Sequence, residues 1–171
     1  MNDIIHIETP ITSDLFCEFM LGMRLCITGC IITGRDAALP RLLELITLPE
    51  TNRDNIELIG SVILHTAVSH AGIGPTSSNK LEIESSIPEL SKAGVKMHIG
   101  KGRISSETVK ALDEFESVYA ITPPLSALLT SKIISQKVLA FPEEGMEALH
   151  LLEVVDFPVI IAAINGKSIY D

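Results

Sequence analysis

The sequence is poor in residues that define several classes of protein. It has no tryptophan, its aromatic residues amount to 4% of 171, and it holds three cysteines. An odd and small number of cysteines argues against a disulfide framework, so we expect a reducing compartment, the cytoplasm. A chain of this length buries roughly 70% of the surface that its unfolded state exposes, which is enough to form a stable core without disulfide bonds. We expect one domain over residues 1–171.

Positive charge is also scarce. The 13 Lys and Arg residues against 22 Asp and Glu residues give a net charge of -9, which repels polyanions, so we expect no nucleic-acid partner and no anionic membrane surface. The most apolar stretch, residues 16–34, contains Glu18, Arg24 and three glycines. It therefore lacks the run of about 20 apolar residues that a bilayer helix needs, and a helix followed by a strand is expected there.

Apolar runs alternate with amphipathic segments along the chain. We expect strands in residues 4–11, 24–33 (with a bulge or close backbone approach at Gly29), 56–60, 61–68, 95–99, 118–121, 137–141, 154–155 and 159–164. Helices are expected after the caps at residues 12–14, at Asp36, at Ser105 or Ser106, and after Pro123. Residues 69–78 predict a structured loop that leads into a helix, and Asn165-Gly166 predicts a hairpin turn. The alternation predicts an α/β domain with a mixed β-sheet core flanked by helices.

Three short segments place a cation or a hydroxyl beside glycines at the end of an apolar run. They are Gly34-Arg35-Asp36, Gly74-Pro75-Thr76-Ser77-Ser78-Asn79-Lys80 and Gly100-Lys101-Gly102-Arg103. Ligands of α/β proteins bind beyond the carboxyl ends of strands, so we expect these segments to converge. A cation about 4 Å from a carboxylate gains about 4 kcal/mol at an effective dielectric constant of about 20, whereas distant carboxylates are screened. Converging Arg35, Lys80 and Lys101 are therefore sufficient for a small di-acid.

The middle segment has two interpretations. A helix start after Gly74-Pro75 would present free backbone N–H groups to an anion, and Thr76 and Ser77 would add hydroxyl hydrogen bonds. The alternative is a glycine-rich turn in which Thr76 or Ser77 is an ordinary helix cap, and the spacing alone favours it. Neither a P-loop nor a dinucleotide fingerprint fits the glycines of this chain.

The cysteines and histidines do not form a recognisable metal motif. Cys17, Cys26 and Cys30 match neither zinc nor iron–sulfur spacing, so we expect buried structural thiols and no metal held by this chain. The five histidines show no paired metal-binding pattern. His70 and His98, which adjoin the glycine segments, are the two that we single out for mutation.

Four motifs in this order carry a resemblance to a known family. They are Gly34-Arg35-Asp36-Ala37-Ala38, Gly74-Pro75-Thr76-Ser77-Ser78, Ile99-Gly100-Lys101-Gly102 and Leu152-Glu153-Val154-Val155-Asp156-Phe157-Pro158. Together they resemble the β subunit, or C-terminal domain, of class I iron–sulfur fumarate hydratases and L-tartrate dehydratases. The resemblance implies a swivelling β/β/α domain. It also implies a [4Fe-4S] cluster held by an α subunit in a heterodimer or heterotetramer, not by this chain; a homodimer is the expected form of the isolated chain.

The resemblance further implies the reversible hydration of fumarate to L-malate. In that reaction Arg35 would orient a carboxylate, Lys101 would supply charge, Thr76 would remove the C3 proton, and Ser77 and Lys80 would bind substrate. The alternatives are a dehydratase of L-tartrate or a related hydroxy diacid, and a non-catalytic carboxylate-binding regulatory domain.

Two positions depart from the family pattern. Leu39-Pro40 stands where a histidine is usual, and Lys80 stands where arginine is usual. Lysine keeps the charge but lacks the planar fork that binds a carboxylate in two places. The identity of the diacid therefore stays open at this point.

Overall fold

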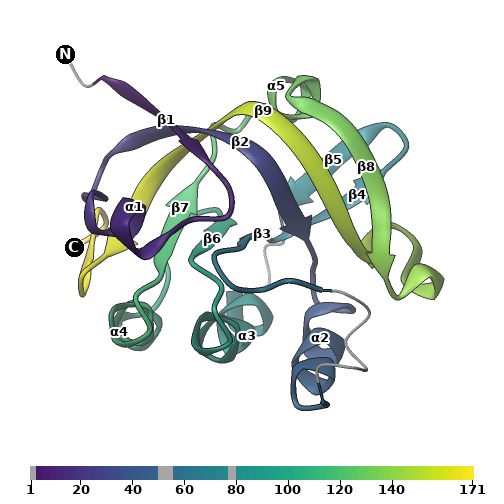
Figure 1. Cartoon of the computed structure of the whole chain (residues 1–171), viewed down its shortest axis with the longest axis horizontal. Coiled ribbons are helices and arrows are strands. Elements are labelled where there is room, and N and C mark those ends of the chain that lie inside the picture. Colours follow the sequence, from purple (N-terminus) through teal and green to yellow (C-terminus); the bar gives the residue numbers. More distant parts are fainter. Residues whose placement is uncertain (1–2, 50–55, 77–79) are drawn as a thin grey trace.

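The structure, a computed structural model, describes residues 3–49, 56–76 and 80–171, with the backbone alone at 75, 76, 80 and 82 (Figure 1). The strands are β1 (Ile4–Glu8), β2 (Arg24–Thr33), β3 (Val62–Leu64), β4 (Thr66–Ser69), β5 (Gly72–Thr76), β6 (Met97–Gly100), β7 (Val118–Ile121), β8 (Ile133–Ala140), β9 (Leu149–Ile164) and β10 (Lys167–Ser168). The helices are α1 (Ser13–Cys17), α2 (Leu39–Ile46), α3 (Lys80–Lys92), α4 (Ser106–Glu114), α5 (Ser126–Ser131) and the 3-10 helix η2 (Pro142–Glu147).

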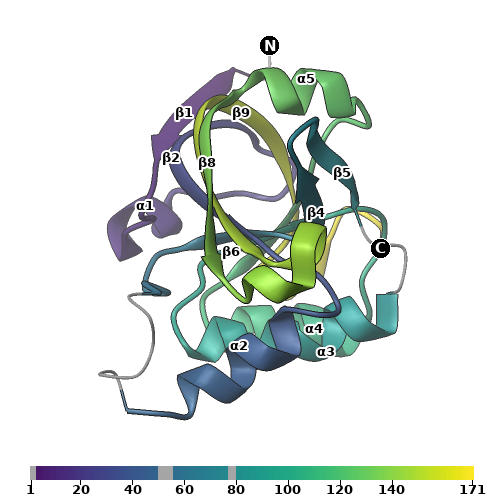
Figure 2. The same cartoon turned by 90° about the vertical axis from the view of Figure 1, so that its right-hand side faces the viewer.

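Five strands close into a ring. β2, β3, β6 and β7 run parallel to one another, and the long antiparallel β9 pairs with β7 on one side and with β2 on the other. β1 extends the sheet beside β2, β8 pairs with β9, and β4 and β5 form a separate hairpin. The strands curve around a common interior (Figure 2). This mixed sheet with flanking helices confirms the expected α/β class and is compatible with a β/β/α domain.

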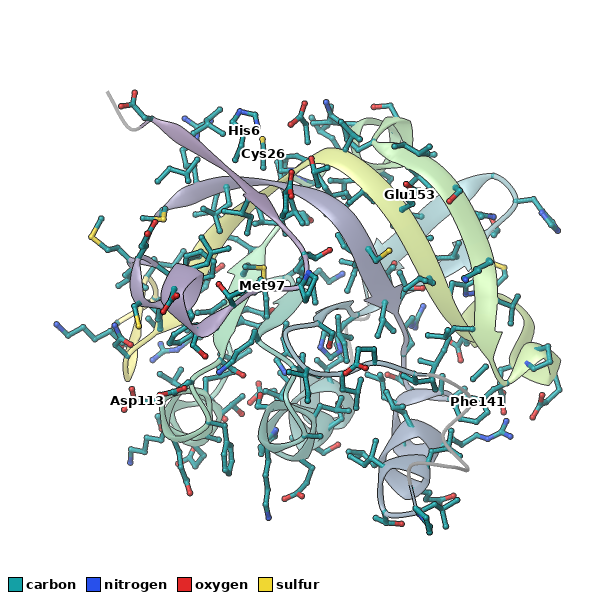
Figure 3. The ribbon with its side chains drawn as sticks, viewed as in Figure 1. His6, Cys26, Met97, Asp113, Phe141 and Glu153 are labelled. Atoms are coloured by element: carbon teal, nitrogen blue, oxygen red, sulfur yellow. The ribbon has the colours of Figure 1, made fainter. Side chains whose placement is uncertain are left out.

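Alternating side chains fill the interior of the ring. The fully buried residues of this cluster include Ile27, Ile31, Leu64, Met97, Ile99 and Phe157, and Met97 is labelled in Figure 3. The helices α2, α3 and α4 lie together on one side of the strands (Figure 1). Their apolar faces form two further clusters against the outer face of the sheet. Within the described part of the chain, no helix is long and apolar enough to cross a membrane.

β2 bends where the sequence predicts a bulge. The pairing of β2 with β9 shifts between Ile27 and Gly29, and Gly29 has a φ of +119°. The hydroxyl of Thr9 occupies the space that a Cβ would need at Gly29. It accepts a hydrogen bond from Cys30 N at 2.7 Å and donates one to Cys30 O at 3.0 Å. Glycine is therefore required here by a close side-chain approach as well as by the backbone conformation.

Several expected boundaries are wrong. Residues 72–76 form strand β5 rather than a loop, so Gly74-Pro75 lies within a strand and not at a helix start; the structure describes helix α3 from Lys80 onward. Residues 56–60 form no strand, and the tail forms one continuous strand through Pro158 instead of two. Helix α2 begins at Leu39 with Ala38 as its N-cap, so Asp36 does not cap it. The hairpin turn at Asn165-Gly166, between β9 and β10, is confirmed.

The expectation of buried cysteines is also wrong. Cys17 and Cys30 are exposed, and Cys26 is partly exposed. Leu25 and Ile27 of β2 point into the ring, so Cys26 between them points outward, and the bulge leaves Cys30 outward as well. The β-rich pattern of this strand identifies the strand but not which of its faces the thiols occupy.

Candidate functional site

The carboxyl ends of three neighbouring strands bring two of the predicted cations to one edge. β2 ends at Thr33 and β6 ends at Gly100, with β3 between them in parallel register. Arg35 follows β2 and Lys101 follows β6, so both leave the sheet at this carboxyl edge. The expected convergence of the Gly34 and Gly100 segments is therefore seen in the structure.

Backbone hydrogen bonds hold this edge together. Gly34 N donates to Leu64 O at 3.2 Å, and His65 N donates to Ile99 O at 2.9 Å. His65, the residue after β3, is thus hydrogen-bonded to β6, and Leu64, the last residue of β3, is hydrogen-bonded to Gly34. His65 consequently lies between the segment that carries Arg35 and the segment that carries Lys101.

Arg35 is held by an acidic residue from a distant segment. Its Nε lies 3.5 Å from Glu147 Oε1 in η2, an ion pair that is too poorly formed to be a hydrogen bond, and its side chain is 24% exposed. Arg41 in turn fastens η2, because its guanidinium contacts Glu144 at 2.8 Å and Glu143 at 2.6 Å. That guanidinium also lies 4.1 Å from the centroid of the Phe141 ring, which Figure 3 labels. Arg35 is therefore positioned by Glu147, while its Nε makes no hydrogen bond to any residue that the structure describes.

Within the part of the chain that the structure describes, four buried polar atoms near this edge have no hydrogen-bond partner. They are Thr33 Oγ1, Arg35 Nε, Asp36 Oδ1 and His65 Nδ1. Buried polar groups are nearly always paired, and each unpaired one costs about 1–3 kcal/mol. Such a concentration is typical of a place where a ligand or bound water supplies the missing partners.

A side-chain hydrogen bond from β7 holds the segment around Lys101 in place. Tyr119 of β7 donates its hydroxyl to Lys101 O at 3.1 Å. A Cβ at Gly100 would lie 2.6 Å from that hydroxyl oxygen, so glycine is required for the contact. Burial raises the pKa of Tyr119 far above its ordinary value, and Tyr170 and Glu84 raise it further, so the group is a neutral donor. The Lys101 side chain itself is exposed.

A buried pair of histidines lies beneath the same edge. His65 Nε2 and His98 Nδ1 are 3.2 Å apart, and His98 Nε2 lies 3.0 Å from Ser91 Oγ of α3. Burial lowers the pKa of His65 to about 4 and lowers that of His98 well below its ordinary value, so both rings are neutral near pH 7. The sequence drew attention to His98 and to the exposed His70, but not to His65. Its position directly after an apolar strand is the signal that was available.

The remaining predicted site residues are described only in part. Ser77 lies outside the described residues. The backbone of Thr76 ends β5 opposite Thr66, which follows His65 directly, so the hairpin returns Thr76 to the same edge. Lys80 is the first residue of α3. The structure thus places the backbones of Arg35, Thr76 and Lys101 at one end of the parallel strands.

The cysteines of this chain do not fit an iron–sulfur cluster. Cys26 and Cys30 lie four residues apart on one strand, a separation of about 13 Å, whereas metal–sulfur bonds are about 2.3 Å long. Burial raises the pKa of the Cys26 thiol, which disfavours the thiolate that binds metal. Among the residues that the structure describes, no group of three His, Cys, Asp or Glu side chains is arranged to hold a metal ion.

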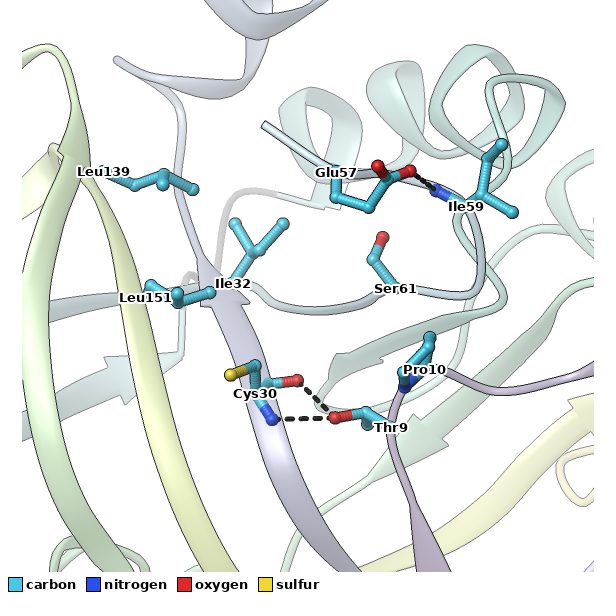
Figure 4. A pocket seen from close by; sticks show the side chains of 9 residues that line it. All are labelled: Thr9, Pro10, Cys30, Ile32, Glu57, Ile59, Ser61, Leu139 and Leu151. Carbon is cyan, nitrogen blue, oxygen red and sulfur yellow. Dashed lines mark hydrogen bonds between the residues drawn. The ribbon is translucent and has the colours of Figure 1, made fainter. Parts of the chain in front are cut away.

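A separate apolar cavity lies on the outer face of the barrel. Its volume is about 280 Å³, and it is lined by Thr9, Pro10, Cys30, Ile32, Glu57, Ile59, Ser61, Leu139 and Leu151 (Figure 4). It shares no lining residue with the edge that carries Arg35 and Lys101. Its described lining is mostly apolar and includes the Glu57 carboxylate but no cation, so it does not suit a dianion.

The fold and the edge define an α/β domain with a closed mixed sheet and a polar, cationic rim at the ends of its parallel strands. Comparison with known families makes the assignment specific. Residues 2–171 match the family described as Fumarase C-terminus, and the chain belongs to that family. The resemblance seen in the four sequence motifs is therefore confirmed.

The relatives include fumarate hydratases and a tartrate dehydratase subunit. The chain is 30% identical over 151 residues to the anaerobic class I fumarate hydratase of Escherichia coli (strain K12), covering 84% of this chain and 27% of that protein. It is 28% identical over 161 residues to fumarate hydratase 2 of Leishmania major, covering 90% and 28%. It is 27% identical over 172 residues to the L(+)-tartrate dehydratase subunit beta of E. coli (strain K12), covering 93% and 82%. The chain thus spans about a quarter of the two fumarate hydratases and most of the tartrate dehydratase subunit.

Proposed function

We propose that this chain is the β subunit of a heteromeric hydro-lyase that hydrates fumarate reversibly to L-malate. The observation that supports the proposal is the placement of Arg35 and Lys101 at one edge, together with the buried Thr33 Oγ1 and His65 Nδ1, which have no hydrogen-bond partner among the described residues. Two cations and two groups that can donate a hydrogen bond match a small dicarboxylate. Family membership supports the reaction class.

The cations of this edge would act on the charge that moves during the reaction. When malate loses water, the C3 proton passes to a base and the electron pair left behind delocalises into the neighbouring carboxylate, which gains negative charge. The pair then forms the C2–C3 double bond as the C2–O bond breaks, and the departing hydroxide takes up a proton to become water. Arg35 would hold a carboxylate through its guanidinium fork, and Lys101 would add a second positive charge. Because these contacts strengthen as charge develops, they stabilise the transition state more than the bound substrate.

Thr76, Ser77 and Lys80 complete the proposed site. Thr76 is the proposed base for the C3 proton, a role for which a threonine hydroxyl needs nearby cations and exclusion of water. Ser77 would donate a hydrogen bond to substrate, and Lys80 would bind a carboxylate. The backbone of Thr76 lies beside His65, at the same edge as Arg35 and Lys101, which supports this grouping.

A partner subunit would complete the enzyme. The cysteines of this chain do not fit a cluster, so the proposed [4Fe-4S] cluster belongs to an α subunit, in a heterodimer or heterotetramer in the cytoplasm. The relative named as a beta subunit supports a partner of this kind. The isolated chain, which we expect to form a homodimer, would then bind dicarboxylate without turning it over.

L-tartrate dehydration is the second candidate function. It is favoured by the coverage of 82% of the L(+)-tartrate dehydratase subunit beta. Lys80, which stands where the family usually carries arginine, leaves the identity of the diacid open. A non-catalytic domain that binds carboxylates is the third. Turnover of the reconstituted complex with fumarate, L-malate and L-tartrate separates the three, because each predicts a different ranking of kcat/KM.

The experiment that tests the site uses paired cation variants in that complex. Arg35→Ala and Lys101→Ala should each lower kcat/KM by about 10- to 150-fold, equivalent to about 1.5–3 kcal/mol for a lost charged hydrogen bond. Lys110→Ala, an exposed cation on α4, is the matched control and should leave kcat/KM unchanged. Unchanged kinetics in both test variants would remove Arg35 and Lys101 from the site. Thr76→Val with preserved turnover would exclude Thr76 as the base.

A further inference from the structure

His65, His98 and Ser91 form a hydrogen-bonded chain that runs from the carboxyl edge of β3 into α3. His65 and His98 are fully buried, and Ser91 is 3% exposed. The links are His65 Nε2 to His98 Nδ1 at 3.2 Å and His98 Nε2 to Ser91 Oγ at 3.0 Å. The outer atom of this chain, His65 Nδ1, has no hydrogen-bond partner among the described residues.

Counting protons allows two arrangements of this chain. A neutral imidazole carries one N–H, and the bond between the two rings needs one proton between its two nitrogens. In the first arrangement both rings are protonated on Nε2, so His98 donates to Ser91 and His65 Nδ1 is a bare acceptor. In the second, both rings are protonated on Nδ1, so Ser91 donates to His98 and His65 Nδ1 is a donor. A mixed pair would place two protons or two lone pairs face to face.

The residue that carries this nitrogen, His65, belongs to the same edge of the sheet as the proposed substrate groups. His65 N is bonded to Ile99 O, one residue before Gly100, while the neighbouring Leu64 O accepts from Gly34 N. Thr33 Oγ1 and Arg35 Nε, which are also buried and make no hydrogen bond to the described residues, belong to the adjacent segment. An anionic oxygen bound among these groups accepts hydrogen bonds and donates none. A nitrogen that meets it must therefore carry a proton.

We infer that His65 is a further ligand-binding residue of this edge, whose Nδ1–H donates to an oxygen of the bound dicarboxylate or of a water held with it. His98 and Ser91 are positioning residues, because they set the tautomer that makes Nδ1 a donor. The inference rests on the proposed function for the class of ligand. The coupling between the two rings, meaning that both carry their proton on the same type of nitrogen, follows from the hydrogen bond between them. It does not depend on the proposed function.

The coupling is tested on the ligand-free full chain labelled with 15N-histidine. Long-range 1H–15N correlation spectra report which ring nitrogen of each histidine carries the proton. We expect His65 and His98 to share one tautomer, either both Nε2–H or both Nδ1–H. His70→Gln removes an exposed histidine and should leave both signals in place. A mixed pair, or a protonated His65 or His98 at neutral pH, would overturn the inference.

The ligand contact is tested by adding L-malate to the same sample, with binding followed separately by calorimetry. In the bound state both rings should be Nδ1–H. His65→Ala should weaken L-malate binding about tenfold, and His65→Asn, whose amide N–H replaces the Nδ1 donor, should restore most of the affinity. Binding of L-malate that leaves the rings Nε2–H, or equal affinity of His65→Ala and wild type, would refute the contact while the proposed function survives. No binding of fumarate, L-malate or L-tartrate to the full chain or the reconstituted complex would instead refute the proposed site, and the ligand contact with it.

Discussion

Acidification from pH 7 to pH 5 should destabilise this protein through its buried histidines. The pKa of His65 is about 4 in the folded state because of burial, against 6.5 in the unfolded chain. Between these two values the unfolded chain binds more protons than the folded one. Stability is therefore present above pH 6.5 and is lost as the pH falls toward 4.

The expected loss from His65 alone is about 2 kcal/mol between pH 7 and pH 5, obtained by integrating the difference in bound protons. Burial lowers the pKa of His98 as well, so its contribution has the same sign. Since domains of this kind have about 5–15 kcal/mol of stability, the change is large enough to measure. Few carboxylates titrate above pH 5, so the histidines dominate this interval.

Urea unfolding of the full chain at pH 7, 6 and 5, followed by circular dichroism, gives the free energy of unfolding at each pH. His65→Asn should flatten the pH dependence even if it lowers stability at every pH, because it removes one titrating group. His70→Gln, at an exposed position, should keep the wild-type dependence. A wild-type change below about 0.5 kcal/mol would refute the reasoning, since the linkage relation would then assign His65 an ordinary pKa.

Three further variants test how the edge is held. Tyr119→Phe should lower the free energy of unfolding by about 1 kcal/mol, because the hydroxyl that donates to Lys101 O is lost. Amide hydrogen exchange should become faster around Lys101 while exchange in the rest of β7 is unaffected. Gly100→Ala should cost about 1–3 kcal/mol in thermal unfolding, and Tyr119→Phe in the same chain should relieve part of that cost. Thr130→Val leaves the N–H of Ile73 without its acceptor at 3.2 Å, so exchange of that amide should accelerate and stability should fall by about 1–3 kcal/mol; slow exchange at Ile73 would contradict the contact.

Local chemistry made some elements predictable. Ser105 accepts a hydrogen bond from Thr108 N as a helix cap should, and Gly29 marks the bulge of β2. Segment β5 was not predictable from its own composition, because its small residues are typical of a loop. Its strand form depends on pairing with β4 and on the hydroxyl of Thr130, which is 57 residues away from Ile73.

Part of the candidate site was likewise predictable from the sequence, and part was not. Arg35 and Lys101 are recognisable because each follows glycine at the end of an apolar run, and strands in parallel order bring such ends together. His65 also follows an apolar run, but no glycine directly precedes it. Its character comes from His98, 33 residues later, and from burial under α3, neither of which the neighbouring sequence encodes. Asp36 resembled a helix cap locally, yet the turn at residues 36–38 leaves Oδ1 buried without a partner.

The closure of the ring by β9 has a consequence for how the protein is made. A ribosome completes β2, β3, β6 and β7 before it synthesises residues 149–164, so the nascent sheet has β2 and β7 as open edges for that interval. Unpaired edges attract other strands, and pairings between distant segments form slowly. A ribosome-bound chain stalled before Leu149 should therefore bind chaperones. Chaperone binding should end once the residues of β9 have been synthesised and have left the ribosome.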